Sequence, residues 1–248
     1  SARTCDAISC SYDSTATSIS IDETVSYKGI AMSVENVMPY TAYRQTSVKT
    51  LSLSPKSNIG AYAFSGCIGI TKATISNEGN IGKSAFEGAM TSANGTLNVT
   101  NKGDIYNRAF FGCTGITNAT ISNEGNIGTS AFEGAMQSGD ATLKVTIPGV
   151  IEERGFYGCT NLKTAEINIV SGGASASLSI GNAAFRGCNN LSSITLGDSI
   201  KSIGSYAFYG CSKLTEVTIP NKTTSLGEYC FSWNSLLANI DLGNGLKT

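Results

Sequence analysis

The chain has 248 residues, of which 41% are hydrophobic and only 14% charged, with a net charge of −1 and no histidine. This composition supplies a sizeable core and argues against intrinsic disorder. A near-neutral chain also lacks the basic surface that binding to nucleic acid or an acidic membrane requires. Because no apolar run approaches the ~20 residues of a membrane-spanning helix, we expect no nucleic-acid partner and no membrane insertion.

Residues 1–47 are predicted to form an N-terminal cap that precedes the repeats. Within this segment, Ser18–Ile21 and Thr24–Tyr27 indicate irregular strands. Tyr43 lies 21 residues before Phe64, a distance close to the spacing found further along the chain. This spacing predicts a degenerate first repeat in which Tyr43 takes the place of phenylalanine.

Residues 48–248 repeat one structural unit about eight times. Eight of the chain's nine phenylalanines recur at spacings of 22, 24, 22, 24, 29, 23 and 23 residues. A fixed period in this range predicts a repeat solenoid, in which each unit packs against its neighbours and the molecule works through an extended surface. The recurring residues are Phe64, Phe86, Phe110, Phe132, Phe156, Phe185, Phe208 and Phe231.

Each unit combines inward-facing apolar residues, a glycine corner and a short strand. An aliphatic residue stands five positions before each phenylalanine, and glycine stands two positions after it in every unit except the last, which has Trp233. Glycine permits the sharp turn that each rung needs. Alternating runs at 70–75, 96–100, 191–196 and 214–219 predict one strand per unit. Strands that share one direction stack into a parallel sheet at about 4.8 Å per rung.

The repeated motif resembles the BspA-like, or Treponema-type, leucine-rich repeat. It is seen most completely in Ile203-Gly-Ser-Tyr-Ala-Phe-Tyr-Gly-Cys-Ser-Lys-Leu-Thr-Glu-Val-Thr-Ile219, and the resemblance covers about residues 48–248. It implies a right-handed coil with a parallel β-sheet on the concave face and short helical or irregular turns on the convex face. Members of the family are generally secreted or surface-attached proteins of bacteria and some mucosal protozoa, so the resemblance implies adhesion or ligand binding without naming a ligand.

Departures from the motif are local. Ala89 and Ala135 replace the motif cysteine, and an insertion at residues 171–179 lengthens one rung, where we expect a bulging loop. The chain stops inside a rung, at the point where the motif would next require Ile-Gly-x-x-Ala-Phe. We therefore expect either a fragment of a longer protein or an abbreviated final rung.

Cysteine use divides into two groups. Cys5 and Cys10 are close in sequence and lie outside the repeats, so one hypothesis is a small disulfide that ties down the cap and favours an exported location. Five other cysteines share the position three residues after the phenylalanine, which predicts a ladder of small buried side chains. Stacking of adjacent rungs would also bring Cys159, Cys188 and Cys211 close enough to pair. The five are Cys67, Cys113, Cys159, Cys188 and Cys211.

We expect no catalysis and no bound metal or cofactor. Without histidine the chain cannot build a Ser-His-Asp or Cys-His arrangement, and zinc sites ordinarily use histidine or clustered cysteines. Glu78, Glu124, Glu152 and Glu153 fall on turns or rung edges and mark no catalytic pair. The Gly-Asn-Ile-Gly strings lack the lysine of a phosphate-binding loop and recur with the corners, which makes them structural.

Strand alternation predicts which residues face solvent on the sheet, because successive side chains point to opposite faces. This face is polar, mostly uncharged and free of aromatic residues. It is either a solvated surface whose threonines favour the strand conformation or a recognition surface. The predicted ligand-binding residues are Thr74, Asn98, Thr120, Lys144, Glu166, Thr195 and Thr218.

Two functions follow from this reading. The first is a monomeric cell-surface or secreted adhesion protein that recognises a protein or glycan, of the host or the extracellular matrix, through the concave sheet face. The second is a structural spacer or stalk segment of a larger surface protein, with no ligand of its own. A dense aromatic or charged cluster on the sheet would favour the first function, and the sequence shows none there.

Overall fold

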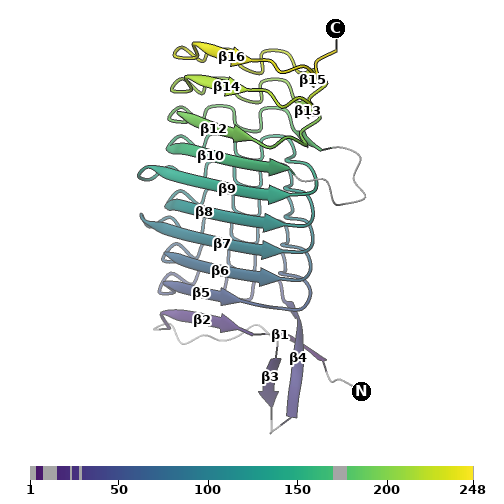
Figure 1. Ribbon diagram of the computed structural model, residues 1–248. Helices are drawn as coiled ribbons and strands as arrows, with labels where there is room; N and C mark the ends of the chain where they lie inside the picture. The colour runs from purple at the N-terminus through teal and green to yellow at the C-terminus, as the bar shows by residue number, and fades with distance from the viewer. Residues whose placement is uncertain (1–3, 8–15, 23, 28–29, 170–177, 248) are drawn as a thin grey trace.

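The computed structural model describes residues 4–7, 16–22, 24–27, 30–169 and 178–247. Most of these residues form a stack of rungs, and a separate three-stranded sheet lies at the N-terminal end of the stack (Figure 1). Eight strands make one parallel sheet, so the predicted repeat solenoid is confirmed. β14 (Glu216–Thr218) and β16 (Asn239–Asp241) continue the stack as a separate pair. The eight strands, in sheet order, are β2 (Ser18–Ile21), β5 (Thr50–Leu53), β6 (Lys72–Asn77), β7 (Gly95–Asn101), β8 (Ile116–Asn123), β9 (Ala141–Ile147), β10 (Leu162–Ile169) and β12 (Ser193–Leu196).

The N-terminal segment contains the strands predicted at both of its positions. β3 (Thr24–Tyr27) pairs antiparallel with β4 (Ile30–Val37), which also pairs in parallel with β1 (Thr4–Ala7). β2 instead pairs in parallel with β5 and is therefore the edge strand of the main sheet. The insertion loop expected near residues 171–179 lies mostly outside the described residues.

The first rung places alanine, and not tyrosine, in the phenylalanine position. The backbone N–H of Ala42 donates to the Ala63 carbonyl at 2.7 Å, as the N–H of Phe64 donates to the Ala85 carbonyl at 2.7 Å. Ala42 is buried, whereas Tyr43 is 40% exposed. The prediction for Tyr43 is therefore wrong, because the pairing between rungs sets an offset of 22 residues instead of 21.

A second ladder of backbone bridges runs along the aliphatic positions that precede the phenylalanines. It begins as single parallel bridges and continues as three two-residue strands, β11 (Ser179–Ile180), β13 (Ser202–Ile203) and β15 (Ser225–Leu226). These aliphatic side chains point into the core. The bridged residues are Val37, Ile59, Ile81, Ile105, Ile127, Ile151 and Ile180.

The turn side of each rung is regular and contains no helix in the described part of the chain. The backbone N–H groups of Tyr62, Phe64 and Gly66 donate to carbonyls of the next rung at 3.1, 2.7 and 2.8 Å. Because these groups point along the stack, they are unavailable for the i→i−4 bonds of an α-helix. The backbone alternates into the left-handed region, with φ of 58° at Tyr62 and 73° at Gly66. The expectation of helical or irregular turns is therefore wrong.

The core is a continuous column of phenylalanine rings, as the repeat predicted. Consecutive rings from Phe64 to Phe231 stack with centroids 4.8 to 5.4 Å apart and planes within 11° of parallel. All of these side chains are fully buried except Phe231, which is partly buried at the end of the column. Each ring between Phe64 and Phe231 therefore contacts its copies above and below, and these two end rings each contact one copy.

The five repeat cysteines are buried free thiols, which confirms the predicted ladder of small side chains. Each thiol donates to a backbone carbonyl of the rung before it, as Cys113 does to Phe86 O at 3.2 Å. Burial raises the pKa of Cys67 to about 11 and raises that of Cys188 and Cys211 well above the ordinary value. The predicted Cys5–Cys10 disulfide remains a hypothesis, because Cys10 lies outside the described residues.

Buried asparagines connect the rungs where the strands end. The side-chain amide of Asn77 donates to Asn101 Oδ1 at 2.7 Å, and that of Asn101 donates to Asn123 Oδ1 at 2.6 Å. A second column lies in the next turn, where Asn80 Oδ1 accepts the backbone N–H of Asp104 and Asn126 Oδ1 accepts that of Val150. The contacts of Asn80 and Asn126 explain the recurring Gly-Asn-Ile-Gly strings as structural, as expected.

Candidate binding surface

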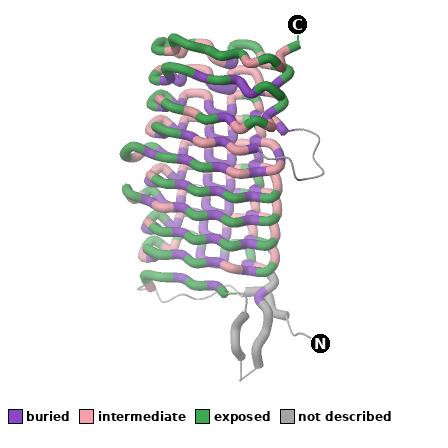
Figure 2. Tube along the Cα trace, viewed as in Figure 1, coloured by how far each residue is buried: buried purple, intermediate pink, exposed green. Residues whose placement is uncertain are grey.

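The solvent-facing side chains at the strand centres form one continuous row across the sheet. Along β6 to β9, buried and exposed residues alternate (Figure 2). The strand register aligns each residue of the row with the next, and all are exposed except Glu166, which is half-buried. We call this row the sheet face; in stack order it is Ser20, Ser52, Thr74, Asn98, Thr120, Lys144, Glu166 and Thr195.

The row carries two charges, and these neutralise each other. Lys144 Nζ lies 3.2 Å from Glu166 Oε1, and Asn168 Nδ2 donates to the same oxygen at 2.7 Å. The hydrogen bond from Asn168 and the neighbouring Lys144 ammonium hold the pKa of the Glu166 carboxyl below its ordinary value. The result is one ion pair at the centre of a surface of hydroxyls and amides.

A shallow hollow of about 280 Å³ lies over β8, β9, β10 and β12. It contains four of the seven residues predicted for ligand binding, so the structure brings these four together. Hydroxyl and amide groups both donate and accept hydrogen bonds, and the Lys144–Glu166 pair adds one charge of each sign. The polar lining residues are Asn118, Thr120, Thr142, Lys144, Thr164, Glu166, Ser193 and Thr195.

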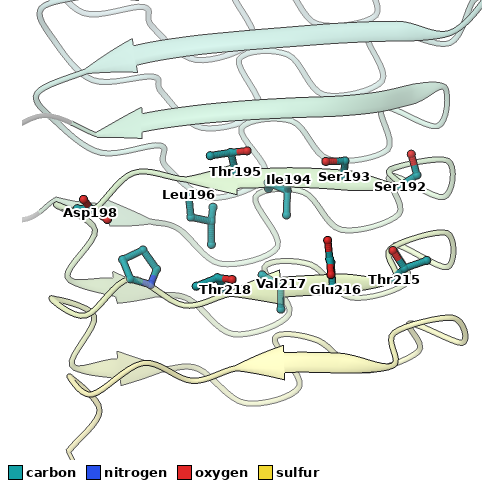
Figure 3. A pocket seen from close by; sticks show the side chains of 11 residues that line it. Ser192, Ser193, Ile194, Thr195, Leu196, Asp198, Thr215, Glu216, Val217 and Thr218 are labelled. Atoms are coloured by element: carbon teal, nitrogen blue, oxygen red, sulfur yellow. The ribbon is translucent and has the colours of Figure 1, made fainter.

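The sheet is interrupted between β12 and β14, and this separates Thr218 from the rest of the predicted row. In the preceding rung the N–H of Gly197 donates to Ile167 O at 2.8 Å. Pro220 occupies the position equivalent to Gly197 and has no N–H to donate. A second hollow, of about 530 Å³, lies at this break and is lined by Thr195 and Thr218 together with Asp198 and Glu216 (Figure 3).

The turn side carries the aromatic and arginine residues that the sheet face lacks. The Arg108 guanidinium lies 3.6 Å from the Phe111 ring centroid and pairs with Glu87 of the rung before. The same triad recurs 46 residues later, where Arg154 lies 3.8 Å from the Tyr157 ring centroid and pairs with Glu133. Sequence reasoning missed these residues because it compared the repeats at the core and strand positions. Reading the positions two before and one after each phenylalanine would have found them.

The architecture and the repeated motif agree with a match to a known family. Residues 36–163 and 149–248 match the BspA type leucine rich repeat region, with six copies. The chain belongs to this family. Since the two matched segments together run from residue 36 to residue 248, the BspA-type repeats include all of the rungs that contribute to the hollows.

Three solved structures resemble this BspA-type repeat protein. A leucine-rich cell surface protein from Faecalibacterium prausnitzii is 17% identical, with 92% of this chain and 88% of that chain covered and a TM-score of 0.34. A leucine-rich repeat protein from Bacteroides ovatus is 18% identical, with 93% and 82% covered and a TM-score of 0.37. The pneumococcal vaccine antigen PcpA is 15% identical, with 94% and 77% covered and a TM-score of 0.36. Among curated proteins there is no significant match.

The rungs of the BspA-type repeats present no metal-binding cluster in the part of the chain that the structure describes. No three carboxylates or cysteines of those residues gather as a metal site. The thiols that could act as nucleophiles are buried, and desolvation raises the pKa of Cys113 far above its ordinary value. Within the same residues, no helix has the length and apolar character needed to cross a membrane.

Proposed function

We propose that this BspA-type repeat protein is a secreted or cell-surface binding module, which acts as a monomer and recognises a protein or glycan of the host or the extracellular matrix. The contact surface is the sheet face, centred on the hollow that holds Thr120, Lys144, Glu166 and Thr195. The observation that carries this proposal is the convergence of these four side chains in one hollow of mixed donors, acceptors and opposite charges. A shallow and largely exposed array of this kind suits a large polar partner better than a small buried ligand.

A structural spacer is the second candidate function, and the uninterrupted phenylalanine column favours it. A column of eight stacked rings should resist bending, because neighbouring rungs are also hydrogen-bonded through the aliphatic ladder, through the turn side and, except between β12 and β14, through the sheet. The spacer function requires no ligand on the sheet face. The two functions therefore differ in whether changing that face changes any interaction.

The experiment compares two double variants that carry the same charge changes on different surfaces. Thr120→Arg with Lys144→Glu alters the hollow, and Thr224→Arg with Lys222→Glu alters exposed positions outside the sheet face. The protein and both variants are screened against matrix proteins and a glycan array, and circular dichroism checks that the fold is kept. Loss of binding in the first variant alone supports the sheet face. Equal binding by both variants contradicts the assignment of this surface, and absence of every partner favours the spacer.

A further inference from the structure

A pocket on the turn side, remote from the sheet face, differs from the rest of that side in charge and in shape. It has a volume of about 550 Å³ and lies across the first four rungs, from Tyr43 to Arg108. This volume falls within the range of roughly 300–1,000 Å³ that is usual for small-molecule sites. The pocket is lined by Tyr43, Arg44, Tyr62, Ser65, Lys83, Ser84, Glu87 and Arg108.

The rung beside the pocket lacks an aromatic side chain that later copies of the same rung carry. Phe111 and Tyr157 follow directly after the core phenylalanine of their rungs, and an arginine lies over each ring. In the first complete rung this position is Ser65, whose hydroxyl donates to Glu87 O at 3.0 Å. Ser65 is smaller than an aromatic ring, and Tyr62 stands where Arg108 stands 46 residues later, so the arginine–aromatic pair of the later copies is absent beside the pocket.

The charges that line the pocket are unbalanced. Arg108 is paired with Glu87 at 2.5 Å, which neutralises both groups. Arg44 and Lys83 are exposed, and neither forms a salt bridge with a carboxylate of the described residues. Three cations against one carboxylate leave a local charge of +2. Two cations without a carboxylate partner beside one cavity favour a ligand with an anionic group. Hydrogen bonds between groups of opposite charge are stronger than those between neutral groups.

The tyrosine rings and the hydroxyl groups of the pocket indicate what kind of anionic ligand it would bind. Tyr62 stacks on Tyr40 with centroids 5.3 Å apart, and Tyr43 is 40% exposed, so aromatic edges and phenol hydroxyls reach the opening. The Ser84 hydroxyl is buried beside the Glu87 carboxylate and makes no hydrogen bond of acceptable geometry. The tyrosine rings and the hydroxyl groups are therefore suited to a ligand whose ring carries several hydroxyl groups as well as a negative charge.

An extended peptide is a poorer match for the same surface. Peptides that bind along a β-ladder need free backbone N–H and C=O groups. Here the N–H groups of Tyr62, Phe64 and Gly66 are already bonded to the next rung. Recognition must therefore come from side chains that converge on one compact ligand.

We propose that this pocket is a second binding site, for a sugar that carries a carboxylate, such as a sialic or uronic acid. Arg44 and Lys83 bind the carboxylate, while Tyr43 and Tyr62 contact the ring and its hydroxyls. The Arg108–Glu87 pair forms the fixed wall against which the sugar packs. This site does not depend on the sheet face, so either site can fail without the other.

The test titrates the full chain by calorimetry and saturation-transfer NMR with two probes, the methyl α-glycoside of N-acetylneuraminic acid and methyl glucuronide. The methyl ester of each is the neutral control with the same ring. Both acidic sugars or one of them should bind, the esters should bind at least about tenfold more weakly, and added salt should weaken binding. Which of the two binds more tightly decides between a sialic and a uronic acid.

Three variants examine the contacts. Lys83→Gln and Arg44→Gln each remove one exposed cation and should weaken binding about tenfold or more. Ser65→Phe should abolish binding by placing an aromatic ring in the pocket. Lys72→Gln, on the sheet, should bind as the unaltered protein does.

Four outcomes would overturn the proposal. They are no binding of either acidic sugar at millimolar concentration, equal binding of the esters, unchanged binding in Lys83→Gln and Arg44→Gln, or tighter binding of an acidic peptide than of either sugar. Because Lys83 and Arg44 are exposed, their variants keep the test decisive even if Ser65→Phe disturbs the fold. Thr120→Arg with Lys144→Glu should retain the sugar, and this result separates the pocket from the sheet face.

Discussion

The rings of Phe86 and Phe110 lie 4.8 Å apart at the centroids, with planes within 1° of parallel. Phe110 has a second stacked neighbour, Phe132, at 4.8 Å, whereas Phe231 at the end of the column has a single stacked partner, Phe208. A side chain in the middle of the column therefore loses contacts on two sides when it is truncated. This difference between middle and end makes the column's contribution measurable.

Phe110→Ala should lower the free energy of unfolding by roughly 3–5 kcal/mol, because neighbouring rungs cannot collapse into the hole. Phe231→Ala should cost clearly less, since that ring is only partly buried and contacts one rung. Urea unfolding followed by circular dichroism measures both changes. Equal losses in the two variants would contradict a stability that depends on contacts between neighbouring rungs.

The asparagine column predicts a second stability effect. Asn101 accepts from Asn77 and donates to both Asn123 and Gly103. Asn101→Ala leaves Asn123 Oδ1 without its donor and removes one of the two acceptors of the Asn77 amide, which keeps Gly79 O. Each buried polar group that loses its partner costs about 1–3 kcal/mol. We expect a loss of at least about 2 kcal/mol in urea unfolding.

The matched control for that change is Asn118→Ala on β8. Asn118 is exposed on the sheet, so its replacement should change the free energy of unfolding by no more than about 0.5 kcal/mol. If both alanine variants had similar stability, the buried amide column would have no special role. The rungs would then be held together by the core and the backbone ladders alone.

The sequence predicted the features that recur in every unit. One strand per rung, the ring column and the thiol ladder each depend on a residue type at a fixed repeat position. The turn side was mispredicted because Tyr62 and similar residues adopt positive φ to bond the next rung, a preference that no local propensity encodes. The Glu87–Arg108 pair joins different rungs and so depends on their register. The break in the sheet at Pro220 and the pocket at Ser65 each depend on one residue that differs from the repeat. A search for periodicity does not detect such single differences.

The Glu87–Arg108 pair predicts a pH dependence of stability. The hydrogen bond from Arg108 holds the pKa of the Glu87 carboxyl below its ordinary value of 4.5 in the folded protein. A folded-state pKa below the unfolded value gives a contribution that is complete above the unfolded value and is lost as the pH falls through the folded value. The pair therefore stabilises the protein at neutral pH and ceases to do so in acid.

Glu87→Gln should reduce the free energy of unfolding at about pH 7, and the reduction should become smaller as the pH falls below 4.5. The difference should stay below about 1 kcal/mol, because the pair is partly exposed and screened by solvent. Arg108→Gln should likewise weaken the dependence of the free energy of unfolding on pH. A difference between Glu87→Gln and the unaltered protein that stays constant from acid to neutral pH would exclude this ion pair as its cause.

The thiol ladder predicts slow chemical modification of the native protein. Cys67, Cys113 and the other repeat cysteines are buried, and burial raises their pKa where a shift is resolved, so little thiolate is present at neutral pH. We expect the six described thiols to resist a thiol-specific reagent until the protein unfolds, with Cys230 near the end of the stack reacting first. Fast modification of all six in the native protein would contradict the packed ladder.

Counting thiols in denaturant without reductant tests the cap. A Cys5–Cys10 disulfide leaves six of the eight cysteines reactive, whereas free cysteines leave all eight reactive.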